Sequence, residues 1–168
     1  MGMTSPWKVT QALRQCVADK LATMSVPVCE LAIIWSGHRD PADVCDCTCQ
    51  AGNGQGWVRI MSITPKPTPA KIPLGGCSGG WIMRIEVGVH RCAPTGVGED
   101  RPTVEAKDAY AKAMMADARA LMAAWACCDW HDKHEIRRGV NEVVPVGPQG
   151  GCGSVIVVGQ VELDGCPC

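Results

Sequence analysis

The segment Trp81–Cys92 constrains the fold of this chain more than any other part of the sequence. Its residues alternate strictly between two sets, Met83, Ile85, Val87 and Val89 against Arg84, Glu86, Gly88 and His90. Successive side chains of a β-strand point to opposite faces of the sheet, so this pattern predicts a strand with one buried face and one polar face. The apolar face of such a sheet has to be covered by a second layer of structure.

Two segments with helical spacing can form that layer. The first begins at Ser5 and Pro6, a capping residue followed by a proline at the first helical position, and Pro27 ends it. The second covers residues 103–128, is rich in alanine, and repeats its apolar residues at spacings of three and four. We therefore predict one amphipathic helix near the start of the chain and a longer one after the alternating strand.

Three more segments are predicted to be strands, residues 30–35, 57–63 and 154–163. The resulting order, α-β-β-β-α-β, is typical of an α+β fold. We expect a mostly antiparallel four-stranded sheet with both helices on one face, in a single domain that spans residues 1–168. Long loops rich in proline and glycine are predicted at residues 36–56 and 64–80, and a further turn rich in these residues follows an apolar start within residues 143–153.

Composition excludes several classes of protein. The 16 basic and 17 acidic residues leave a net charge of −1, so the chain lacks the basic surplus typical of general nucleic-acid binding. The first ten residues do not resemble a secretory signal, and no apolar run reaches the roughly 20 residues of a membrane span. We expect a soluble protein made in the cytoplasm, although its 12 cysteines are more typical of secreted, disulfide-stabilised domains.

Two groups of cysteines and histidines are candidates for a zinc site. The first consists of Cys45, Cys47 and Cys49, whose C-x-C-x-C spacing differs from the C-x₂₋₄-C pairs of structural zinc sites. The second consists of Cys127, Cys128, His131 and His134. Disulfides and buried thiols explain both groups more simply, because cysteine is among the most buried residue types. We predict no metal and no cofactor, with a small zinc-binding module as an alternative.

The sequence contains no recognisable catalytic motif. It has no G-x-S-x-G elbow, and the H-D-K-H-E run at 131–135 matches neither H-E-x-x-H nor H-x-x-E-H. The glycine-rich segments 52–56 and 147–153 lead into predicted strands, whereas phosphate-binding loops lead into helices. We therefore predict that the protein is not an enzyme.

Residues 64–80, called the arm below, contain four prolines and four glycines. Ile72 and Leu74 make the arm too apolar for a simple spacer, and a loop of this length usually has a function. We predict that it contacts neighbouring subunits through Pro65, Lys66, Pro67, Lys71, Ile72 and Leu74. The competing interpretation is an ordinary surface loop.

Three tryptophans, Trp35, Trp57 and Trp81, lie at the ends of predicted strands. Tryptophan is enriched at interface hot spots, but it also fills cores efficiently. Because the chain has no phenylalanine, we expect all three to fill the core.

Several motifs occur together along most of the chain. They are C-x-C-x-C at 45–49, G-W-V-R at 56–59, the single Cys77 in the arm, E-V-G-V-H-R-C-A-P at 86–94, A-C-C at 126–128 and P-V-G-P-Q-G-G-C-G at 145–153. This combination resembles the neck proteins of long-tailed phages from GC-rich hosts, most closely the tail terminator, over roughly residues 45–163. The predicted order of elements is similar to the tail-terminator fold. Another head–tail connector protein, a stopper or an adaptor, is the alternative within the same group.

The resemblance implies a homo-oligomeric ring, hexameric in the family, at the neck of the virion. Such a ring ends polymerisation of the tail tube protein and joins the tube to the head-side connector, or stopper, protein. Genomic DNA passes through its lumen without sequence-specific binding. The resemblance also implies assembly in the host cytoplasm and no membrane partner.

A virion is assembled inside a cell but has to survive outside it, which accounts for a cysteine-rich chain without a secretion signal. We predict disulfides that form late, at loops and strand ends. The candidates are Cys45, Cys47, Cys49, Cys77, Cys92, Cys128 and Cys152. Cys16 lies beside Val17 on the apolar face of the first helix and is predicted to stay free.

Overall fold

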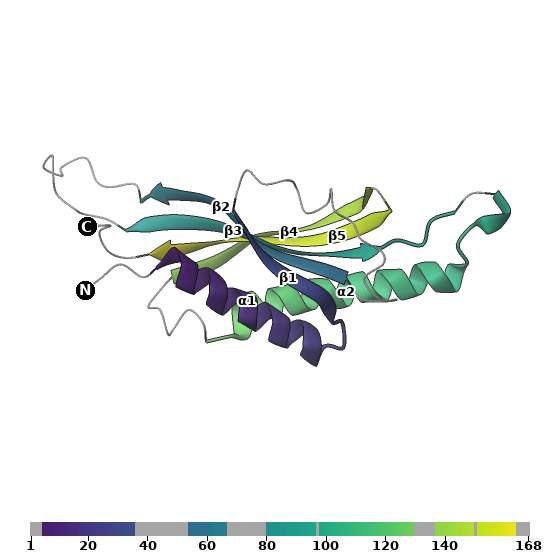
Figure 1. Cartoon of the computed structure of the whole chain (residues 1–168), viewed down its shortest axis with the longest axis horizontal. Coiled ribbons are helices and arrows are strands. Elements are labelled where there is room, and N and C mark those ends of the chain that lie inside the picture. Colours follow the sequence, from purple (N-terminus) through teal and green to yellow (C-terminus); the bar gives the residue numbers. More distant parts are fainter. Residues whose placement is uncertain are drawn as a thin grey trace, which may run out of the picture.

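A computed structural model gives the fold, and it describes residues 5–35, 54–66, 80–96, 98–129, 137–149 and 151–163. The elements are α1 (Pro6–Thr23), β1 (Val28–Trp35), β2 (Gly54–Pro65), β3 (Trp81–Cys92), the short 3₁₀ helix η2 (Gly98–Asp100), α2 (Val104–Cys127), β4 (Arg137–Gln149) and β5 (Cys152–Leu163). Two long helices and one sheet make an α+β fold, as predicted (Figure 1).

Within the described residues the sheet has five strands, in the order β1-β2-β3-β5-β4. β1 pairs with β2 in parallel, and the other three pairings are antiparallel. The connection between β1 and β2, residues 36–53, exceeds the dozen or so residues that a parallel pairing requires. The sheet is therefore mixed, with one parallel pairing that the sequence pattern does not indicate.

The prediction of a four-stranded sheet is wrong because it leaves out β4. Its sequence, RRGVNEVVPVGPQ, contains two prolines and two glycines, and these residues disfavour a strand on sequence grounds. β4 is the outer strand beside β5, and an outer strand tolerates proline because one row of its N–H groups has no partner strand. Register shifts at Val140/Glu142 and Val146/Gln149 accommodate the irregular backbone.

The two helices cover one face of the sheet and enclose the hydrophobic core with it (Figure 1). α1 contributes residues at helical spacing, and β3 contributes the four apolar residues of its alternating pattern, all completely buried. The core residues from these two elements are Val9, Leu13, Cys16, Val17, Leu21, Met83, Ile85, Val87 and Val89. The predicted buried face of β3 is confirmed.

The boundaries of the helices follow from local sequence. Ser5 is the N-cap of α1 and is followed by proline, although its side chain makes no capping hydrogen bond. Thr103 caps α2, and its side chain accepts a hydrogen bond from the N–H of Ala106 at 3.2 Å. After α1 the chain turns at Ser25, whose φ is 57°, before β1 begins. This turn lets β1 run back beside α1 (Figure 1).

A buried ion pair ties the helical layer to the sheet. Arg91 of β3 points toward the helices and binds both carboxylate oxygens of Asp117 in α2, at 2.5 and 2.7 Å. The same guanidinium donates to the carbonyl of Val26, in the turn between α1 and β1, at 3.0 Å. Burial raises the pKa of Asp117, and the contact with Arg91 opposes that rise. One arginine therefore fixes the relative positions of three parts of the fold.

Candidate functional site

The two outer strands of the described sheet, β1 and β4, lie at opposite edges. Each carries large apolar side chains that are exposed to solvent. Trp35 at the end of β1 is 57% exposed, while Val140 and Val143 of β4 are 45% and 37% exposed. The expectation that Trp35 fills the core is therefore wrong, because within the described sheet β1 has a neighbouring strand on one side only. Outer strands with exposed apolar residues are templates for pairing with another chain.

An apolar groove lies beside the β4 edge, on the side of the sheet that the helices cover. It has a volume of about 400 Å³ and lies between α2 and β4. Its walls include Tyr110, Met114, Met115, Val143, Pro145 and Val155. Met115 is 71% exposed at its rim. The Tyr110 hydroxyl is hydrogen-bonded to the backbone of Gly153, and desolvation raises the pKa of Tyr110. The groove suits an apolar or aromatic group.

A buried polar cluster lies on the opposite face of the sheet. Trp57 donates its indole N–H to Glu86 at 2.7 Å, and Arg59 donates to the second oxygen of the same carboxylate at 2.7 Å. His90 is hydrogen-bonded to Ser154 at 2.7 Å, and its ring packs against that of Trp57 with centroids 4.4 Å apart. The polar side of β3 is thus largely buried rather than solvated.

A serine beside a histidine is also the arrangement of a nucleophile and its base. Here His90 and Ser154 are only 2% and 3% exposed, and the ring and the hydroxyl are hydrogen-bonded to each other. The neighbouring carboxylate of Glu86 is engaged by Trp57 and Arg59. We therefore assign the cluster a structural role, in which Trp57 is buried as expected but on the face without helices.

The base of the arm is closed by the fold. Pro65 pairs with Trp81 across β2 and β3, and the N–H of Lys66 donates to the carbonyl of Gly80 at 2.9 Å. The ammonium group of Lys66 forms an ion pair with Glu162 of β5 at 3.1 Å. Of the predicted interface residues, Pro65 and Lys66 are thus placed at this base. The others, Pro67, Lys71, Ile72 and Leu74, lie outside the described residues.

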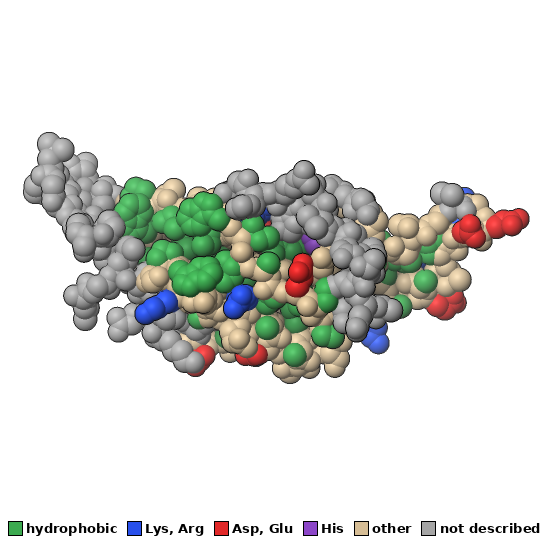
Figure 2. Space-filling model, in the orientation of Figure 1, with side chains coloured by type: hydrophobic (Ala, Val, Ile, Leu, Met, Phe, Trp, Pro, Cys, Tyr) green, Lys and Arg blue, Asp and Glu red, His purple; other side chains and the backbone are tan. Residues whose placement is uncertain are grey.

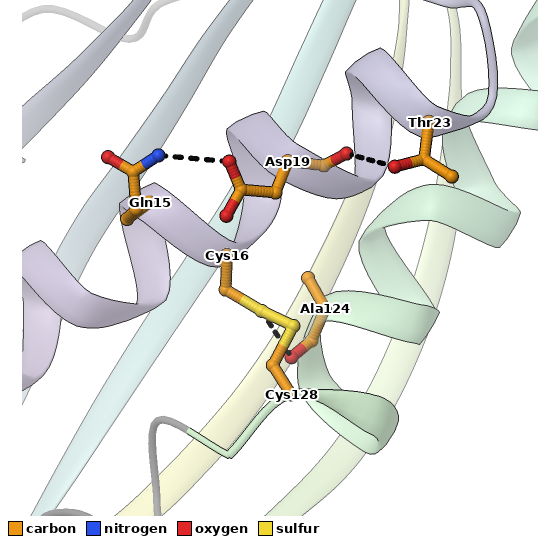
Figure 3. Close-up of a disulfide and its surroundings, with 6 residues drawn as sticks. All are labelled: Gln15, Cys16, Asp19, Thr23, Ala124 and Cys128. Carbon is orange, nitrogen blue, oxygen red and sulfur yellow. Dashed lines mark hydrogen bonds between the residues drawn. A yellow bond between two sulfur atoms is a disulfide. The ribbon is translucent and has the colours of Figure 1, made fainter.

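A disulfide joins the two helices. Cys16 of α1 bonds to Cys128, the residue after α2, with Cα atoms 6.3 Å apart (Figure 3). The prediction that Cys16 stays free is wrong, because the buried face of α1 that carries Cys16 packs against the end of α2. The bond closes a loop of 112 residues, and native disulfides of this kind contribute about 2–5 kcal/mol. Cys127, its neighbour in α2, is a free and exposed thiol.

Some of the remaining cysteines predicted to form disulfides lie within the described residues, and the others lie outside them. Cys92 and Cys152 face each other across β3 and β5 with sulfurs 3.9 Å apart, too far for a bond between them, and each takes part in a disulfide. Cys29 of β1, which is absent from the predicted candidates, also takes part in one. Cys45, Cys47, Cys49 and Cys77 lie outside the described residues.

The described residues contain no group of three or more His, Cys, Asp or Glu side chains arranged to hold a metal ion. Cys128 is in a disulfide, so it has no thiolate to offer zinc, and its proposed co-ligands His131 and His134 lie outside the described ranges. Within the part that the structure describes, no helix is long and apolar enough to cross a membrane.

The distribution of side chains over the surface is uneven. Figure 2 shows acidic side chains at the tip formed by η2 and the start of α2, where Glu99, Asp100 and Glu105 are exposed. Hydrophobic side chains gather on the visible half of the molecule away from this tip. On the face shown, the acidic tip and the hydrophobic half of the described residues therefore differ in chemical character.

The sequence matches no protein-family model, and it shows no significant similarity to a curated protein.

Proposed function

We propose that this protein is a structural component of a virion that forms a ring at the neck of a long-tailed phage. As a tail terminator, it ends the tail tube and joins it to the head-side connector, while the genomic DNA passes through the lumen. The observation that best supports this proposal is the pair of apolar outer strands, β1 and β4, at opposite edges of one sheet.

Two different surfaces on opposite sides of a subunit favour head-to-tail contacts. A contact of this kind leaves one surface of each type unused at the ends of the assembly, so it repeats until the rotation closes a ring or continues as a filament. A closed ring removes both outer edges, which are otherwise sites of uncontrolled aggregation. Self-association through the edges thus gives the geometry that a neck ring needs.

The arm supplies a second kind of contact in this proposal. Its base is fixed by the Lys66–Gly80 hydrogen bond and by the Lys66–Glu162 ion pair, so the arm leaves the subunit from a defined position. Its sequence combines lysines with Ile72 and Leu74. We propose that the arm contacts a neighbour in the ring or the tube end.

A deletion of residues 67–79 tests the role of the arm. Because Lys66 and Gly80 are already hydrogen-bonded, a two-residue Asn-Gly turn can connect β2 to β3 without moving either strand. We expect a folded subunit that no longer joins tails in an infection complemented with the variant. The control replaces residues 67–79 with a Gly/Ser segment of equal length. If that control restores tail joining, the arm is only a spacer.

The function itself is tested in virions. Phage particles that lack this chain should have tails of irregular length or heads without attached tails. Images of wild-type particles should show copies of the chain around the axis where the tube meets the head. Normal tails in its absence would overturn the proposal. Density on the head side of the neck, without contact to the tube, would assign the chain to a stopper or adaptor instead.

A further inference from the structure

The neighbouring elements α1 and β1 each carry one exposed tryptophan near the same end. Trp7 in the first turns of α1 is 54% exposed, and Trp35 at the end of β1 is 57% exposed. Residues 7–23 of α1 extend about 24 Å at 1.5 Å per residue. Residues 28–35 of β1 return about 23 Å at 3.3 Å per residue. Because β1 runs back beside α1, Trp7 near the start of the helix and Trp35 at the end of the strand lie toward the same end of this pair of elements. We call Trp7 and Trp35 the tryptophan patch.

The tryptophan patch and the groove lie on the same side of the sheet. Trp35 pairs in register with Ile60, and Val143 and Pro145 pair with Val157 and Val155. Ile60, Val155 and Val157 all belong to the core under the helices. Residues directly opposite each other on neighbouring strands share a face of the sheet. A sheet continued from β4 of one copy to β1 of the next therefore brings Trp35 to the side on which the groove lies.

We propose that the occupant of the α2–β4 groove is the tryptophan patch of a second copy of this chain, with β1 of that copy lying along β4. This inference rests on the proposed ring and names its interface. The groove has a volume of about 400 Å³, within the range of sites that enclose aromatic ligands. Tryptophan is the residue type most enriched among interface hot spots.

The area that the two tryptophans can bury explains why the strands take part as well. A buried tryptophan removes about 150–250 Å² from water, and these two are already nearly half buried, so each adds on the order of 100 Å². A stable interface buries about 800 Å² per partner. The tryptophans therefore supply roughly a quarter of that area. Pairing of β1 with β4, together with Val140 and Val143, supplies the contact that remains.

Two single variants and their mixture test this interface. Trp35→Ser removes one tryptophan of the patch but keeps the groove, and Met115→Glu places a charge at the groove but keeps the patch. We expect wild-type protein to form closed oligomers by native mass spectrometry and sedimentation, and each variant to be monomeric. A one-to-one mixture should form a dimer of twice 17.8 kDa and nothing larger, because each variant retains one of the two complementary surfaces.

The controls separate this interface from loss of folding. Val104→Glu changes a residue that is 67% exposed on α2 outside the groove, and it should assemble like wild type. Far-ultraviolet circular dichroism of every variant should match wild type, since the changed side chains are exposed, whereas the unfolding temperature falls where assembly is lost because association stabilises the folded state. Trp7→Ser is a second variant of the patch and should also prevent assembly.

Three results would overturn the inference. They are variants that assemble like wild type, monomeric variants whose mixture contains no dimer, and a wild-type chain that stays monomeric at millimolar concentration. None of these decides the proposed function, which depends on the tails of virions that lack the chain. If those tails are abnormal and the variants still assemble, the ring stands and its interface lies elsewhere.

Discussion

Asp117 and Arg91 show how much a single buried contact determines in this fold. Arg91 is the last inward-facing residue of β3 before Cys92, and it is buried. The carboxylate of Asp117 and the carbonyl of Val26 accept hydrogen bonds from the guanidinium of Arg91. Removing one partner of such a pair leaves the other charge buried without compensation.

We predict that Asp117→Ala lowers the free energy of unfolding by about 3–5 kcal/mol, because it leaves the Arg91 guanidinium buried without its carboxylate. Urea denaturation measures this difference. Asp108→Ala, which removes an exposed carboxylate from the same helix, is the matched control and should change stability by less than about 0.5 kcal/mol. A loss below about 1 kcal/mol for Asp117→Ala would show that the pair contributes little.

Individual side chains also mark the limit of what the sequence predicts. The apolar periodicity places Cys16 on the buried face of α1 correctly, but periodicity says nothing about which residue lies opposite. The partner Cys128 is 112 residues away in sequence. Likewise, Trp35 and Trp57 both lie near ends of predicted strands, and only the order of strands in the sheet distinguishes the exposed residue from the buried one.

At the scale of elements, strands with a regular pattern were predictable and irregular ones were not. Trp81–Cys92 is a strand with the predicted bounds, because its strict alternation has only one structural meaning. β4 breaks the pattern with Pro145, Pro148, Gly139 and Gly147, and it forms a strand because β5 offers an unpaired edge. Its existence depends on tertiary context, which no local window contains. The groove beside β4 could not be predicted for the same reason.

Two glycines of the sheet differ in the space around them. Gly88 lies opposite Trp57 in the register of β2 and β3, and a Cβ there would collide with the indole ring. Gly88→Ala should therefore lower stability by about 1–3 kcal/mol and disturb the near-ultraviolet circular dichroism of tryptophan. A Cβ at Gly139 of β4 would have nothing within 4 Å, so Gly139→Ala should leave both measurements nearly unchanged. Equal losses for the two variants would contradict this account of the Trp57 packing.

For the whole molecule, charge is the property that bears on the proposed passage of DNA. The net charge is −1, and exposed acidic side chains gather at the tip formed by η2 and the start of α2. A lumen that releases DNA has to avoid fixed positive charge, because cations that contact phosphates hold the duplex. The composition is consistent with a conduit rather than a DNA-binding surface.

We predict that the purified protein does not retain duplex DNA at about 150 mM salt in a filter-binding measurement. A variant with Glu99, Asp100 and Glu105 each replaced by lysine should bind DNA, with an affinity that falls as salt rises, because every replacement adds two units of positive charge. This variant shows that the measurement can detect binding. Tight, salt-dependent binding by the wild-type chain would contradict the proposed conduit.

The Cys16–Cys128 bond has a mechanical consequence. It shortens the path of force through the chain, because tension applied to the two termini passes through the disulfide and bypasses the residues between its cysteines. This bond alone should thus shorten the full extension of the subunit by the length of 112 residues, on the order of 370–400 Å when fully stretched. Optical tweezers applied to the oxidised wild type and to a variant with Cys16→Ser and Cys128→Ser measure this difference, because a reductant would also open the disulfides of Cys29, Cys92 and Cys152. In the oxidised state β1, β2, β3 and α2 are shielded from tension along the chain.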